Sequence, residues 1–109
     1  MKNISLILLL APLLSSVASY AAEADFKLVI KDHRFQPAEL NVPAGKKIKM
    51  SIENKDATPE EFESHSLNRE KVISGNGTAT IYVGPLEPGR YDFYGEFNKD
   101  TAQGVIVVK

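Results

Sequence analysis

The chain has 109 residues, and its 13 basic and 14 acidic side chains almost cancel, leaving a net charge of −1. This balance gives no electrostatic reason to expect nucleic acid or an anionic membrane surface as a partner. No cysteine is present, which excludes a small fold held together by disulfides. The chain must therefore be stabilised by an apolar core.

The first predicted element is an export signal over residues 1–21. Lys2 gives it a positive start, an apolar run from Ile4 to Leu14 follows, and Ser19-Tyr20-Ala21 offers small side chains to a signal peptidase. An apolar run of roughly 11–15 residues is too short to span about 30 Å of hydrocarbon. We expect cleavage within residues 21–24, a periplasmic location and no membrane insertion of the mature protein.

The remaining residues 22–109 suffice for one domain, and most of this domain is predicted to be β-strand. Apolar and polar residues alternate in most segments, which turns one face of each strand toward a core. Pro37 restricts its segment to an edge or a bend, and Gly and Pro residues predict the turns. The expected strands cover residues 26–31, 35–42, 46–53, 69–73, 78–83, 91–95 and 105–108. Seven or eight short strands predict an all-β Greek-key sandwich.

Residues 54–68 are the exception, because they show no strand pattern and are unusually acidic. Thr58-Pro59-Glu60-Glu61 carries the signature of a helix N-terminus, with a Thr cap, Pro at the first helical position and Glu after it. A short helix is one interpretation of this segment. An extended loop is the other.

Either conformation brings a carboxylate close to an imidazole. In an extended chain Glu61, Glu63 and His65 point the same way, whereas in a helix only Glu61 and His65 share a face. Oxygen ligands with one imidazole suit iron, manganese or zinc better than cuprous copper. The alternative is that the acidic run is a solvated loop. Glu96, in the last polar loop, is a further candidate ligand if the sandwich brings that loop opposite this segment.

The C-terminal segment 88–108 is laid out as a turn, an alternating strand, a polar loop and a final strand. This layout resembles the ligand-bearing corner of a cupredoxin, where relatives with a blue-copper site carry cysteine, histidine and methionine. The corresponding residues here are Gly95, Asn98 and Thr101. Because a thiolate is what makes a blue-copper site, the chain is not expected to be a blue-copper electron carrier.

The mature chain as a whole is similar to EfeO-type cupredoxin-like domains of bacterial iron uptake. The landmarks are Asp32-His33-Arg34-Phe35-Gln36-Pro37, Pro43-Ala44-Gly45-Lys46, Glu61-Phe62-Glu63, residues 86–92 and Gly104-Val105-Ile106-Val107. The resemblance implies a protein that binds, oxidises or hands on iron beside a high-affinity iron permease or a sister periplasmic metal-binding protein. Some such domains have cysteines where this chain has Phe35 and Gly95, so copper binding of that type is not expected.

Two functions follow as hypotheses. The first is a metal-binding protein for iron or another divalent ion, copper included but without a blue site, with metal ligands Glu61, Glu63, His65 and Glu96. The second is a metal-free module that docks in a periplasmic transport complex. A binding protein is favoured over an enzyme, although ferrous oxidation stays open. No serine has a partnered histidine, so a hydrolase is unsupported.

Overall fold

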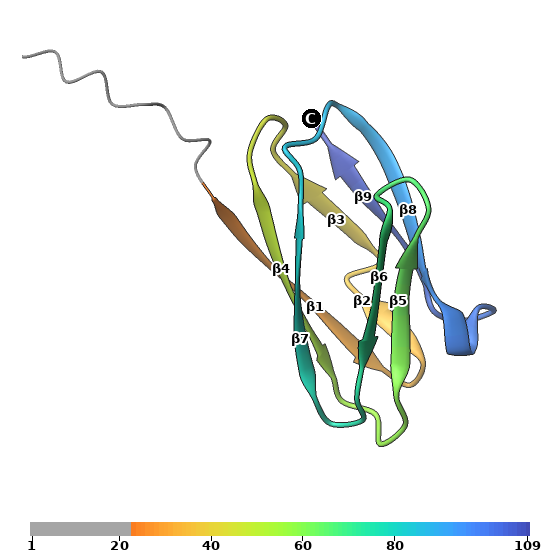
Figure 1. Ribbon diagram of the computed structural model, residues 1–109. Coiled ribbons are helices and arrows are strands. Elements are labelled where there is room, and N and C mark those ends of the chain that lie inside the picture. Colours follow the sequence, from red (N-terminus) through yellow and green to blue (C-terminus); the bar gives the residue numbers. More distant parts are fainter. Residues whose placement is uncertain (1–22) are drawn as a thin grey trace, which may run out of the picture.

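The computed structural model describes residues 23–109 as a sandwich of two β-sheets (Figure 1). The predicted all-β sandwich is confirmed, whereas the predicted signal at residues 1–21 lies outside the described residues. The elements are β1 (Ala24–Lys31), β2 (Arg34–Gln36), β3 (Glu39–Val42), β4 (Ile48–Asn54), β5 (Glu60–Ser64), β6 (Arg69–Ile73), β7 (Thr78–Val83), β8 (Gly89–Gly95), the short 3₁₀ helix η1 (Glu96–Asn98) and β9 (Gln103–Val108). Within residues 23–109, no helix has the length and apolar character needed to cross a membrane.

The two sheets have the strand orders β2-β1-β4-β7 and β3-β9-β8-β5-β6. The pairs β1–β4 and β3–β9 are parallel, and the other pairs are antiparallel. The chain passes repeatedly from one sheet to the other, so the two layers enclose a common core. The final strand β9 lies inside the second sheet, between β3 and β8.

The segment predicted as one strand over residues 35–42 forms two strands in different sheets. β2 pairs with β1, whereas β3 pairs with β9. Pro37 lies between them, as expected for a residue that cannot donate to a strand ladder. The change of sheet lets Phe35 and Leu40 both reach the core.

Residues 60–64, where no strand was predicted, form β5, so the extended interpretation is correct and the helical one is wrong. β5 pairs with β6 on one side and with β8 on the other. Its buried residues alternate strictly with partly exposed ones. Phe62 is fully buried, and its ring stacks on that of Phe93 at 5.0 Å between centroids. Pairing on both sides outweighs the local helix signal of the sequence.

The core consists of aliphatic side chains around three phenylalanine rings. Phe35 meets Phe62 and Phe93 edge-on, at centroid distances of 6.1 and 4.9 Å. The Phe93 ring fills the space that a side chain at residue 104 would need, so Gly104 is required there. The other large buried side chains are Leu28, Ile30, Ile48, Met50, Ile52, Ile73 and Ile106.

The loop before β5 is fixed by two polar side chains. The buried Asn54 amide donates to the Thr58 carbonyl at 2.8 Å. The Asp56 carboxylate accepts the backbone N–H groups of Asp32 and His33 at 2.8 and 2.9 Å. The His33 bond is the main cause of a lowered Asp56 pKa. These contacts hold the β1–β2 turn, a left-handed polar bend, against the start of β5.

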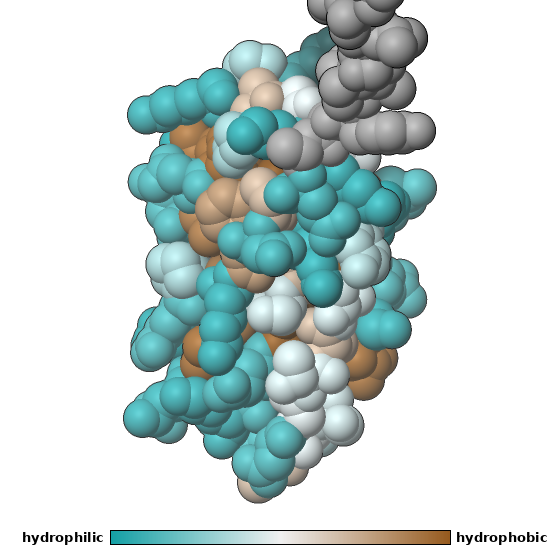
Figure 2. All heavy atoms as spheres, turned by 90° about the vertical axis from the view of Figure 1, so that its left-hand side faces the viewer, coloured by the Kyte–Doolittle hydropathy of each residue, from teal (hydrophilic) through white to brown (hydrophobic). Residues whose placement is uncertain are grey.

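The surface on the β4 side of the molecule is mainly hydrophilic. Figure 2 shows that face, on which apolar atoms emerge only in separate patches between polar side chains. Small scattered patches of this kind are usual for a soluble domain and indicate no particular partner.

Candidate functional site

The alternation of β5 divides its acidic residues between two environments. Glu60 points inward and is 1% exposed, in line with Phe62 and Ser64. Glu61 and Glu63 point to the outer face of the sheet and are partly exposed. Because successive side chains of a strand lie on opposite faces, one run of glutamates forms two separate features.

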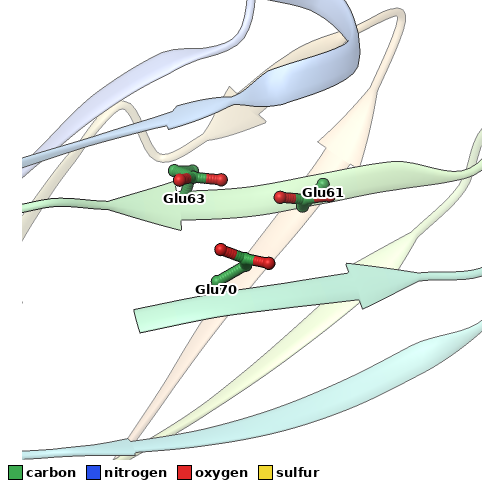
Figure 3. A group of neighbouring side chains, drawn as sticks. All are labelled: Glu61, Glu63 and Glu70. Atoms are coloured by element: carbon green, nitrogen blue, oxygen red, sulfur yellow. The ribbon is translucent and has the colours of Figure 1, made fainter. Parts of the chain in front are cut away.

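On the outer face, Glu61 and Glu63 of β5 meet Glu70 of the neighbouring strand β6. Each contributes a carboxylate oxygen, and these three oxygens lie within 4.8 Å of one another (Figure 3). The register explains the meeting, since Glu63 and Glu70 are direct cross-strand partners. Like charges directly opposite each other are destabilising in a sheet. We call these three residues the outer carboxylate cluster.

Crowding of the three acids changes the protonation of Glu61. A hydrogen bond with Glu63 raises the pKa of Glu61 to about 7, and the charges of Glu70, Glu63 and Glu96 act in the same direction. Near neutral pH Glu61 is therefore partly protonated. A divalent cation placed among these oxygens would remove the same repulsion. Oxygen-only ligands suit hard or borderline ions, such as magnesium, manganese and ferrous iron.

The other two predicted ligands, His65 and Glu96, lie outside this group of oxygens. His65 follows β5, and its Nε2 lies 3.0 Å from the hydroxyl of Tyr94. Glu96 opens η1, and its carboxylate lies 3.4 Å from the Lys99 ammonium. The predicted ligand set is thus represented in the described residues by two carboxylates in close contact. Whether His65 and Glu96 join them around a metal stays a prediction.

Glu70 was not among the predicted ligands, although a signal for it was present. Residues 69–73 were expected to form a strand, and Glu70 lies in an exposed part of it. Because β5 was not predicted as a strand, residues 69–73 had no predicted neighbour, and their register could not be assigned. Once β5 is known to be a strand, the β5–β6 hairpin places Glu70 opposite Glu63.

The inward feature lies where the cupredoxin-like ligand corner was predicted. The Glu60 carboxylate accepts the Asn98 side-chain amide at 2.7 Å, the Phe97 backbone N–H at 2.9 Å and the Glu61 backbone N–H at 3.0 Å. A Cβ atom on Gly95 would lie 2.6 Å from Cδ of Glu60. The Glu60 carboxylate thus occupies the space between Gly95 and Asn98.

These residues do not fit a copper ion of the blue type. Gly95 supplies no thiolate, Asn98 supplies no imidazole, and Thr101 is exposed at the surface. The buried Glu60 carboxylate at the corner already accepts three N–H donors. Soft copper sites are built from thiolate, thioether and imidazole ligands, and the corner contains none of them.

Comparison with known proteins gives one curated relative and many similar structures. An uncharacterised protein of Rickettsia prowazekii (strain Madrid E) is 48% identical over 84 residues, which are 77% of this chain and 67% of the relative. The blue copper protein auracyanin A of Chloroflexus aurantiacus has a TM-score of 0.70 at 15% identity, covering 81% of this chain and all of that one.

A chain of a heme-copper terminal oxidase dimer is also similar, with a TM-score of 0.66 at 17% identity. The match covers 78% of this chain and 64% of the oxidase chain, so this protein spans less than two thirds of that relative. At these identities the structural likeness concerns the fold alone. The model of the cupredoxin-like domain matches residues 4–108, and the chain therefore belongs to the cupredoxin-like domain family.

Proposed function

We propose that this protein binds a divalent cation at the outer carboxylate cluster and serves iron uptake in the periplasm, with ferrous iron as its cargo. The observation that carries the proposal is the meeting of three carboxylate oxygens within 4.8 Å, accompanied by a raised Glu61 pKa. Repulsion of this kind is relieved when a cation binds. The same binding stabilises the folded state by linkage.

An open face suits a carrier better than a storage or electron-transfer site. Glu61 and Glu63 are partly exposed and Glu70 is exposed, so water or a partner protein can complete the coordination of a bound ion. An ion held in this way can be handed on without unfolding of the sandwich. The iron permease or sister metal-binding protein implied by the family resemblance is the expected recipient. Oxidation of the iron would require an electron acceptor as well, and the proposal is limited to binding and transfer.

Titration calorimetry with ferrous, manganous, zinc and cupric ions under anaerobic conditions tests the proposal. The wild type is compared with Glu63→Gln/Glu70→Gln, which keeps the shape of the cluster and removes two charges. The matched control is Glu39→Gln/Glu87→Gln, which removes two exposed carboxylates elsewhere. His65→Ala and Glu96→Gln, measured separately, show whether these residues join the site.

Ferrous iron is expected to bind the wild type and the control alike, and the cluster variant at least about tenfold more weakly, a loss of about 1.4 kcal/mol. Two results contradict the proposal: binding of all four ions no tighter than millimolar, or equal binding by the cluster variant. Copper loading is expected to give no intense band near about 600 nm, because no thiolate is available.

A metal-free docking module is the second candidate. It is favoured by Phe97, which lies in η1 at the ligand corner and is 51% exposed. Large aromatic side chains are enriched at protein–protein interfaces. If the titration detects no metal binding, docking becomes the better explanation of the protein's function. A Phe97→Ser variant that no longer associates with its transport complex would then support it.

A further inference from the structure

The ligand corner is closed by groups of the protein itself. The buried Glu60 carboxylate receives one N–H from its own strand and two from η1, on the Phe97 backbone and the Asn98 side chain. The described residues contain no buried polar side-chain atom without a hydrogen-bond partner. The corner is therefore saturated without any ligand.

We propose that the Glu60–Asn98 pair takes the place of a metal ion at this corner, fixing the 95–102 loop in the metal-free protein and excluding metal from it. A metal at such a corner would join the loop to the strand opposite. Here the carboxylate on β5 makes that connection, with hydrogen bonds in place of coordination bonds.

The hydrogen-bond pattern shows how one side chain can fix the whole loop. The Asn98 backbone carbonyl accepts the N–H of Ala102 at 2.8 Å. The Gly95 N–H in turn donates to the Ala102 carbonyl at 2.8 Å. Both ends of the loop are thereby tied to Asn98, whose side chain is tied to Glu60. Hydrogen bonds to a charged acceptor contribute more than neutral ones, which suits a connection that lies under the surface.

Exclusion of metal follows from the same contacts. An ion that used the Glu60 oxygens would have to displace their N–H donors and leave those partly buried donors without this partner, which is costly. The only other side-chain oxygen of this pair is the neutral Asn98 carbonyl. This inference concerns different side chains from the outer carboxylate cluster, so either proposal can fail without the other.

A double-mutant cycle read by amide hydrogen exchange at pH 8 tests the pair. Asn98→Asp places a second carboxylate against Glu60 and should speed exchange of the Phe97 and Ala102 amides by about tenfold or more. Glu60→Gln alone should have little effect, because the Asn98 amide can turn and accept from the glutamine. Glu60→Gln combined with Asn98→Asp should restore slow exchange, because the glutamine amide donates to the aspartate.

Asn98→Ala, which removes the amide without adding charge, is the second variant if Asn98→Asp fails to fold, and it should also speed exchange. The metal titration follows backbone NMR signals of the Glu63→Gln/Glu70→Gln variant, in which the outer carboxylate cluster is removed, during additions of the diamagnetic cuprous and zinc ions. Signals of residues 95–102 are expected to stay in place, with or without prior treatment with a chelator. Slow exchange in both Asn98 variants, failure of the double variant to recover, or metal-induced shifts within 95–102 would each overturn the inference.

Discussion

Glu60 and Glu61 are neighbours in the sequence and opposites in the structure. Glu60 is buried and its carboxylate accepts three N–H donors. Glu61 lies on the outer face, where one of its carboxylate oxygens lies within 4.8 Å of oxygens of Glu63 and Glu70. The same side chain is thus an anchor at one position and a source of repulsion at the next. The role of each glutamate therefore depends on the face of the strand on which it lies, and not on its residue type.

The comparison also shows where a cation could be useful. At the inner position the negative charge is already balanced by donors, so a metal would have to compete with the protein. On the outer face three carboxylates repel one another and Glu61 keeps its proton up to about pH 7, so a cation can take the place of that proton. Cation binding on this sandwich is therefore expected away from the corner that relatives with a blue-copper site use.

The largest expected difference between the two positions is in stability. Glu60→Ala removes a buried side chain and the acceptor of the partly buried donors of Phe97 and Asn98, and should lower the free energy of unfolding by about 2–4 kcal/mol. Glu61→Ala should leave stability unchanged or raise it, because it removes repulsion. Chemical denaturation of both variants measures this difference. Equal losses would show that the inward and outward glutamates do not differ as described.

A smaller effect is expected in the pH dependence of stability. The pKa of Glu61 is raised from 4.5 to about 7 in the folded protein, so the folded state holds this proton more tightly than the unfolded state does. The resulting stabilisation is full below about pH 4.5 and is lost as the pH rises through about 7. The midpoint temperature of thermal unfolding should therefore decrease when the pH is raised from 5 to 8.

Glu61→Gln should flatten this decline, whereas the control Glu87→Gln should keep it. A divalent cation added at pH 8 should restore the midpoint of the wild type if the outer cluster binds it. Thermal unfolding, followed by circular dichroism at pH 5 and pH 8, measures these changes in the unfolding midpoint. A decline of the same size in Glu61→Gln would show that other groups cause it.

The smallest effect concerns Tyr94, the cross-strand partner of Glu63. Burial raises the pKa of the Tyr94 phenol, and the charge of Glu63 raises it further. Glu63→Gln should lower this pKa part of the way toward its ordinary value, because the contribution of burial remains. A site-resolved NMR titration of the tyrosine rings detects the change. An unaltered Tyr94 pKa would indicate that Glu63 and Tyr94 do not interact across the strands.

The overall fold could be predicted from the sequence because apolar alternation and turn residues are local signals. β5 was missed for a physical reason: Thr58-Pro59 imitates a helix start, and a buried glutamate at residue 60 hides the inward pattern of Phe62 and Ser64. The partner that makes this glutamate acceptable, Asn98, is 38 positions away. Sequence reasoning found Glu61 and Glu63, whereas Glu70 required a strand register that no local pattern contains.

The position of β9 has a consequence for folding. It lies between β3 and β8 and pairs Glu39 with Val105, residues 66 positions apart. The second sheet therefore cannot be completed until β9 is available, and the entropy cost of closing so long a loop comes before the gain from the strand contacts. Folds dominated by such distant pairings form slowly, on the order of milliseconds to seconds. Deletion of β9 should consequently destabilise the sandwich strongly, since β3 would lose its only strand neighbour within residues 23–109.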